Sequence, residues 1–218
     1  MQTVEHVLSA LAGLGVTDAI LGLSGPEIPI GDGSANEITQ ALMAAGFTDL
    51  CGVGFPAPRP IEIRQPILVQ EGQASILAEP LVGAPDGVVC VMVYELDYGG
   101  AGPIPVQSAS LTVVAGQGVP GYASEVATAR TFCLVEEAQA MRKMGLFTKF
   151  EPKDLLVIGA DGPIDNSYRF PNEPARHKLL DLLGDLSLAG RPIHGRITAT
   201  RSGHSLNHQM ARALAALA

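Results

Sequence analysis

The segment RHKLLDLLGDL, residues 176 to 186, combines one histidine and two aspartates with a run of leucines. On a helix with about 100° per residue, His177, Asp181 and Asp185 fall within a narrow arc, and Lys178 lies at the edge of that arc. The leucines fill the opposite side, as expected for an amphipathic helix. The polar arc has two interpretations, a solvated helix face or a pair of metal ligands at positions i and i+4, and this segment alone leaves both open.

Other residues that could bind a metal or take part in catalysis lie far from this segment in the sequence. Glu5 and His6 are adjacent at the start of a helical segment, so one side chain can hold a metal while the other reaches water bound to it. His204 stands where a strand ends and a helix starts, a place that presents side chains at the edge of a site. Thr131 follows a predicted helix. Taken singly, these residues are better explained as a chance pair, a surface histidine and a strand threonine. The remaining histidines have unremarkable surroundings: His194 and His208.

The overall charge excludes one class of function. The chain of 218 residues has 14 Lys and Arg against 22 Asp and Glu, a net charge of −8, and no basic run, so a nucleic-acid partner is not expected. No stretch approaches the roughly 18 consecutive apolar residues of a membrane helix, and the N-terminus has no basic segment leading into a hydrophobic core. A cytoplasmic location is therefore predicted. The three cysteines, without CxxC spacing, indicate neither a disulfide framework nor a thiolate zinc site.

The elements that must position these residues follow from hydrophobic periodicity. Residues 3–14 and 34–45 are predicted helices, and the apolar run at 19–23 is a predicted short strand. One strand is too little sheet to cover two helices. Residues 1–58 are therefore predicted to form an incomplete first domain.

The pattern changes at Arg59, where a second domain, residues 59–218, is predicted to begin. Strand-like runs separated by Gly, Pro and Asp indicate an antiparallel sheet, and they occupy 60–70, 74–81, 87–96 and 109–115. Helices are predicted next, at 121–128, 134–143, 173–188 and 204–217. A late strand is predicted between the last two helices, at 191–200. A strand and turn at 154–165 belong to an inserted strand-helix unit near 145–170. This order indicates an α+β fold rather than a parallel α/β fold.

Three stretches of the chain stand in a recognisable order: TVEHVLSALAGLG with SGPEIPIGDGSA, then ARTF, then ARHKLLDLLGDLSLAG with SGHSLNH. They resemble the motifs of the zinc-dependent UDP-3-O-acyl-N-acetylglucosamine deacetylases that make lipid A, and the similarity extends over nearly the whole chain. The resemblance implies two α+β domains, each a sheet backed by helices, with the active site between them. It also favours the metal interpretation of residues 176 to 186.

The resemblance further implies a set of metal-binding and catalytic residues. His6, His177 and Asp181 match the three Zn²⁺ ligands, which leaves a fourth position open for water. Glu5 matches the general base that takes a proton from that water. His204 matches the protonated histidine that stabilises the oxyanion and then protonates the leaving amine.

Four more positions match residues that support this chemistry. Asp185 matches the carboxylate that orients the catalytic histidine and keeps it charged. Thr131 matches the hydroxyl that supports the tetrahedral intermediate. Lys178 and Phe132 match substrate-binding positions.

Two departures from the family pattern concern the substrate more than the reaction. Relatives have a long segment before the TVEH motif that supplies half of the first domain, and Cys133 replaces a glycine at the entrance to the inserted unit, which forms an acyl-chain passage in relatives. A first domain without that segment is predicted to leave apolar helices uncovered. The chain is then expected to form a homodimer or to bind a separate polypeptide, unless the true start codon lies upstream.

The leading hypothesis is a zinc-dependent amidohydrolase that removes acetyl from an acylated UDP-N-acetylglucosamine. One alternative is a non-catalytic or regulatory homologue with a structural metal site, and another is a deacetylase of a non-lipid N-acetyl substrate. Glu5 argues against the first alternative, because structural zinc sites are usually closed by four protein ligands and need no adjacent base. The second alternative uses the same residues and stays open.

Overall fold

The largest element of the fold is a mixed sheet. In the computed structural model, which describes residues 2–100, 102–145 and 155–217, five strands follow the order β2-β3-β9-β4-β5. Their bounds are Ile67–Glu71 for β2, Ala74–Glu79 for β3, Val88–Leu96 for β4, Gln107–Val114 for β5 and Ile193–Thr200 for β9. The sixth strand, β1 (Ile61–Glu62), pairs with β9 off this path. Strand β9 is parallel to β1 and β4 but antiparallel to β3, so it joins the two hairpins.

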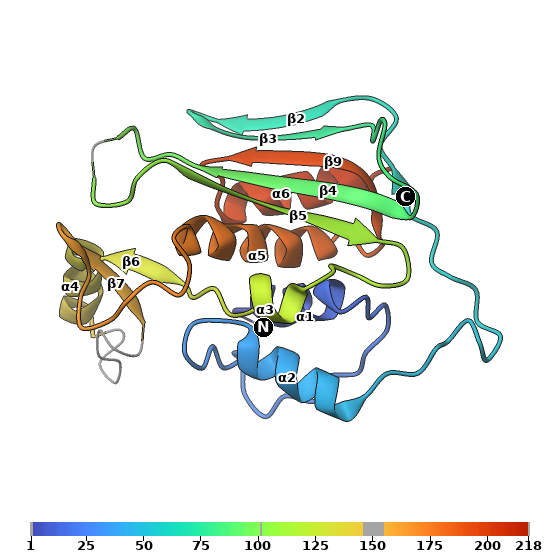
Figure 1. The fold of residues 1–218 in the computed structure, drawn as a ribbon, viewed down its shortest axis with the longest axis horizontal. Coiled ribbons are helices and arrows are strands. Elements are labelled where there is room, and N and C mark those ends of the chain that lie inside the picture. Colours follow the sequence, from blue (N-terminus) through green and yellow to red (C-terminus); the bar gives the residue numbers. More distant parts are fainter. Residues whose placement is uncertain (1, 101, 146–154, 218) are drawn as a thin grey trace.

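One face of this sheet is buried by two helices, α5 (Glu173–Ser187) and α6 (His204–Ala215) (Figure 1). Alternate residues of β4 are buried, from Cys90 to Leu96, as expected for a strand with one face in the core. Helix α5 places its leucines in the same core. Its polar side chains therefore point away from the sheet, toward the elements on its other side.

The helix α1 (Glu5–Gly13) crosses α5 at very short range, and Gly184 makes this approach feasible. A Cβ atom at Gly184 would lie 2.0 Å from the carbonyl oxygen of Glu5, so only glycine fits at this point. The other helices near α1 are α2 (Asn36–Ala45) and the single turn α3 (Tyr122–Glu125). The side chain of Tyr122 fills the space beside Gly13 and fixes the far end of α1.

A second, smaller sheet contains β6 (Phe132–Leu134), β7 (Leu156–Gly159) and β8 (Gly162–Pro163), and the helix α4 (Val135–Lys143) follows β6. The strand and turn expected at 154–165 are confirmed as β7 and β8. Residues 146–154 of the predicted inserted unit lie outside the described residues.

The predicted α+β class is confirmed. The sheet predicted to be antiparallel is mixed, because the late strand β9 pairs in parallel with β1 and β4. The prediction of a strand at 19–23 is wrong, because these residues have no regular secondary structure and Ile20 is fully exposed. Among the described residues 2–58 the extended pairing is limited to an isolated bridge between Gln2 and Glu27. An apolar run without a neighbouring strand has no ladder to join. The division at residue 58 stays a prediction.

Two other boundaries differ from expectation for local reasons. The run at 60–70 is divided into β1 and β2, because Pro66 has no backbone N–H to contribute to a ladder. The helix predicted at 121–128 is a single turn, α3, with bounds Tyr122–Glu125. Within the described part of the chain, no helix has the length and apolar character needed to cross a membrane.

Candidate metal centre and active site

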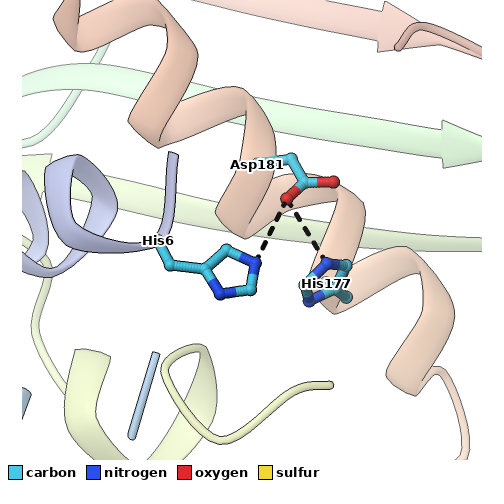
Figure 2. A group of neighbouring side chains, drawn as sticks. All are labelled: His6, His177 and Asp181. Carbon is cyan, nitrogen blue, oxygen red and sulfur yellow. Dashed lines mark ion pairs between the residues drawn. The ribbon is translucent and has the colours of Figure 1, made fainter. Parts of the chain in front are cut away.

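Three buried side chains from two helices meet where α1 crosses α5 (Figure 2). Helix α5 provides His177 and Asp181 one turn apart, with 3.3 Å between His177 Nε2 and Asp181 Oδ1. Helix α1 provides His6, whose Nε2 lies 3.9 Å from the same oxygen. One donor atom from each residue lies within 4.8 Å of the others. The three side chains predicted as ligands are therefore brought together from opposite ends of the sequence.

The donor set, with imidazole nitrogens and a carboxylate oxygen, fits a metal ion. Catalytic zinc is held by about three N or O ligands, each at about 2.0–2.2 Å from the ion. In tetrahedral geometry two such ligand atoms are about 3.3–3.6 Å from each other. The Nδ1–H of His177 donates to the carbonyl oxygen of Ala129 at 3.1 Å, so the lone pair of this ring is on Nε2, which faces Asp181. Such a hydrogen bond on the distal ring nitrogen is typical of histidines that bind metals.

The charges of this cluster also suit a cation. Burial lowers the pKa of His177 to about 4, so its imidazole is neutral at neutral pH, as a metal ligand must be. Burial alone would raise the pKa of Asp181, but His177 and Lys178 lower it below its usual range. Because His177 is neutral at neutral pH, the positive charges that act on Asp181 come from Lys178, whose Nζ donates to Asp181 Oδ2 at 3.2 Å, and from His204. Asp181 is therefore an ionised carboxylate with Oδ1 directed into the cluster.

Lys178 and Phe132, the two predicted substrate-binding residues, lie next to each other. The ammonium of Lys178 lies 5.9 Å from the centroid of the Phe132 ring, within range of a cation–π interaction. Burial is the largest single effect and opposes the charge on Lys178, but Asp181 together with Tyr94 and Tyr98 raises the pKa of the amine. The pair places a fixed positive charge beside the aromatic ring where the small sheet begins.

A second group of titratable side chains adjoins the first. Glu5, Asp185 and His204 each place one ligand-type atom within 4.8 Å of the others. The Nδ1–H of His204 donates to Asp185 Oδ2 at 2.8 Å. This hydrogen bond raises the pKa of His204 to about 9, against the opposing effect of partial burial. His204 is therefore an imidazolium at neutral pH, and Glu5, next to His6 on α1, is a carboxylate nearby.

Two residues that sequence reasoning missed complete the surroundings of Asp185. Asn207 Nδ2 donates to Asp185 Oδ2 at 2.8 Å, and His208 Nε2 donates to Asp185 Oδ1 at 3.1 Å. The sequence held a signal for His208, since it stands four residues after His204 on one helix, the same spacing as the pair on α5. Asp185, which is only 1% exposed, thus accepts hydrogen bonds from three side chains of α6.

Thr131 lies two residues after Ala129, whose carbonyl oxygen contacts His177. Its backbone N–H donates to the carbonyl oxygen of Gly33 at 2.6 Å, and its methyl group occupies the space where Gly33 lacks a Cβ. Within the described ranges no hydrogen bond links its hydroxyl to the metal cluster. Its supporting role stays a prediction.

Comparison with known proteins identifies a family for this chain. Residues 1–216 match the family model described as UDP-3-O-acyl N-acetylglycosamine deacetylase (LpxC). Proteins named UDP-3-O-acyl-N-acetylglucosamine deacetylase are similar to this chain in Thermosynechococcus vestitus, with 37% identity over 216 residues, and in Acidithiobacillus ferrooxidans, with 35% over 214 residues. The protein of that name from a Nostoc species is 34% identical over 222 residues.

The matched regions cover nearly all of this chain. They amount to 99%, 97% and 100% of its length in the same three comparisons. They cover 70%, 66% and 74% of the respective relatives, so the chain spans about two thirds to three quarters of their length. With a family model matched from end to end and a metal-type cluster at its motifs, the chain belongs to the UDP-3-O-acyl N-acetylglycosamine deacetylase family.

Proposed function

We propose that this protein is a zinc-dependent deacetylase that hydrolyses the N-acetyl group of UDP-3-O-acyl-N-acetylglucosamine in lipid A biosynthesis. The observation that carries the proposal is the adjacency of two groups: the buried cluster of His6, His177 and Asp181, and the charged pair of His204 and Asp185. A metal-type donor set, a carboxylate and an imidazolium side by side are the components of amide hydrolysis at neutral pH.

His6, His177 and Asp181 would hold the ion. The chemistry that zinc supplies when bound is polarisation of the acetyl carbonyl and a lowered pKa for water. Glu5 is the proposed general base, because it is the carboxylate next to the ligand His6 and is only partly exposed. It takes a proton from water as the water oxygen forms a bond to the carbonyl carbon.

His204 is the proposed general acid. Its imidazolium stabilises the negative charge that develops on the carbonyl oxygen, then gives a proton to the nitrogen as the carbon–nitrogen bond breaks. Acetate and the free amine of the sugar are the products. Asp185 keeps the ring oriented and charged, and Thr131 is the proposed hydroxyl partner of the intermediate.

Lys178 and Phe132 are proposed to contact the substrate beside the metal. An ammonium and an aromatic face within 5.9 Å of one another match a ligand that combines negative charge with an apolar part. An acylated nucleotide sugar has both. The cytoplasm is the proposed location, since all three cysteines are free, as is usual in a reducing compartment.

The test is hydrolysis by the purified 218-residue chain of UDP-N-acetylglucosamine with and without the 3-O-acyl group, with metal content measured on the same sample. We expect about one zinc per chain and activity only with the acylated substrate. Equal activity on both substrates would indicate a deacetylase of a non-lipid N-acetyl substrate. Bound zinc without hydrolysis of either substrate would indicate a non-catalytic homologue with a structural metal.

We also propose that the N-terminal region associates with a second copy of the chain or with a separate polypeptide. Large apolar side chains between residues 20 and 55 are strongly exposed, among them Ile20, Phe47, Val53 and Phe55. Exposed apolar groups gathered in one region of the sequence are typical of surfaces that another chain covers.

A further inference from the structure

The peptide group between Ala129 and Arg130 makes a hydrogen bond at each end. Its carbonyl oxygen accepts from His177 Nδ1 at 3.1 Å, and its N–H donates to Glu173 Oε1 at 3.1 Å. Glu173 and His177 are one turn apart on α5. A single peptide group from the segment after α3 therefore bridges a buried carboxylate and a buried imidazole of the same helix.

The carboxylate at one end of this bridge is held very firmly. Glu173 is 0% exposed and forms a two-pronged ion pair with Arg130, whose Nε and Nη2 donate to Oε1 at 2.8 Å and Oε2 at 3.1 Å. The N–H of Arg169 donates to Oε2 as well, at 2.6 Å. The guanidinium is fixed in turn by Asn166 Oδ1 at 2.8 Å and the carbonyl oxygen of Ser167 at 2.6 Å. The orientation of Glu173 is therefore over-determined by its neighbours.

We propose that Glu173 is a positioning residue for His177, acting through the peptide group of Ala129 and Arg130. A carboxylate on a peptide N–H polarises that group, which makes its carbonyl oxygen a stronger acceptor. The stronger acceptor keeps the proton of His177 on Nδ1 and the lone pair on Nε2, directed at the cluster. The inference rests on the proposed role of His177 as a metal ligand.

A purely stabilising role explains this arrangement less well. Buried ion pairs contribute little net stability compared with apolar residues of similar volume, because both charges lose their hydration. This ion pair is built on the residue whose peptide group contacts the imidazole. An ion pair at Arg130 is where a group that positions His177 has to lie. A role in stability alone would not require the ion pair to lie there.

The test compares two variants by two measurements. Glu173→Gln together with Arg130→Met removes both charges, so neither is left buried without a partner, and Glu173→Asp keeps the charge but withdraws it from the peptide N–H. The first measurement is the Zn²⁺ dissociation constant of the chelator-stripped full chain, by competition with a chromophoric chelator. The second is the NMR resonance of the His177 Nδ1–H in the metal-free protein.

We expect the dissociation constant to rise about tenfold or more in the double variant, as is typical when a partner behind a metal ligand is lost. The Nδ1–H signal should shift upfield and exchange faster with water. Glu173→Asp should show smaller changes in the same direction. The matched control is Glu125→Gln, which removes an exposed ion pair with Arg176, the residue before His177, at 2.7 Å. Its zinc affinity and resonance should equal those of the wild type.

Folded variants with wild-type zinc affinity and an unchanged Nδ1–H signal would overturn the inference. Circular dichroism of each variant establishes that it is folded. A wild-type chain that binds no Zn²⁺ would contradict the proposed function instead, and the resonance in the metal-free protein would still decide the role of Glu173.

Discussion

The carboxylate of Asp185 shows how single residues set the chemistry of this site. Burial leaves it with three hydrogen-bond donors, all from α6, and one of them is the imidazolium of His204. The carboxylate of Glu5 lies within 4.8 Å of the same group but on another helix. The proposed base and the proposed acid therefore come from different helices.

Glu5→Gln tests the base. The amide has the shape of the carboxylate but does not accept a proton from water, so we expect turnover to fall about 100-fold or more. Zinc content should be unchanged, because Glu5 is not among the three ligands. Both are measured on one preparation, with the exposed Glu71→Gln on β2 as the control. A Glu5→Gln enzyme with wild-type turnover would remove the assignment.

The pH dependence tests the acid. His204 must be protonated to act, so activity should be present below its pKa of about 9 and be lost as the pH rises through that value. Asp185→Asn removes the largest cause of the raised pKa, so the alkaline loss of activity should move to lower pH, toward the ordinary histidine value of 6.5. The pH profile of kcat/KM, with metal content checked at each end, measures this shift. An unchanged alkaline limb in Asp185→Asn would contradict the pairing.

At the scale of elements, the site depends on the crossing of α1 and α5. Helical spacing alone places His177 and Asp181 next to each other on α5. His6 reaches them only if α1 packs closely against α5. The crossing is set by Gly184, where the two backbones approach within the space of a missing side chain. The candidate metal cluster is therefore a property of a helix pair rather than of one helix.

Gly184→Ala should separate the two helices. The added Cβ would lie 2.0 Å from the Glu5 carbonyl oxygen, so we expect a loss of about 1–3 kcal/mol in unfolding free energy and weaker zinc binding. Denaturant unfolding and zinc titration measure the two effects. Gly22→Ala is the matched control, because no heavy atom lies within 4 Å of its added Cβ. Equal zinc affinity in the two variants would show that α1 tolerates the displacement.

Elements with strong periodicity were predictable, and contacts between distant elements were not. The spacing of His177, Asp181 and Asp185 followed from the sequence, because all three lie on one helix with a leucine face. Resemblance to a family supplied His6 as their partner. The peptide bridge to Glu173 had no sequence signal, since it joins segments about 40 residues apart through a backbone group. The prediction of a strand at 19–23 was wrong, because an apolar run forms a strand only where a neighbouring strand can pair with it.

At the scale of the whole molecule, the exposed apolar residues before residue 56 predict association. Light scattering should show a dimer or a larger species, and Phe47→Ser with Phe55→Ser should shift it toward monomer, because these side chains are 54% and 61% exposed. Leu68→Ser on the edge strand β2 is the control, an equally exposed apolar residue elsewhere. A monodisperse wild-type monomer with full zinc-dependent activity would contradict the prediction.

The central position of β9 has a consequence for how the chain folds. The hairpins β2-β3 and β4-β5 are complete by residue 114, yet they share no ladder until β9, residues 193–200, enters between them. The pairing of β9 with β3 spans more than half of the chain, and its pairing with β4 spans slightly less than half. Both therefore carry a large loop-closure cost and belong late in folding. His204 follows β9 by four residues. The proposed acid thus reaches its place only when the sheet closes, and a ribosome-bound chain that still lacks β9 has two unjoined hairpins and no assembled acid.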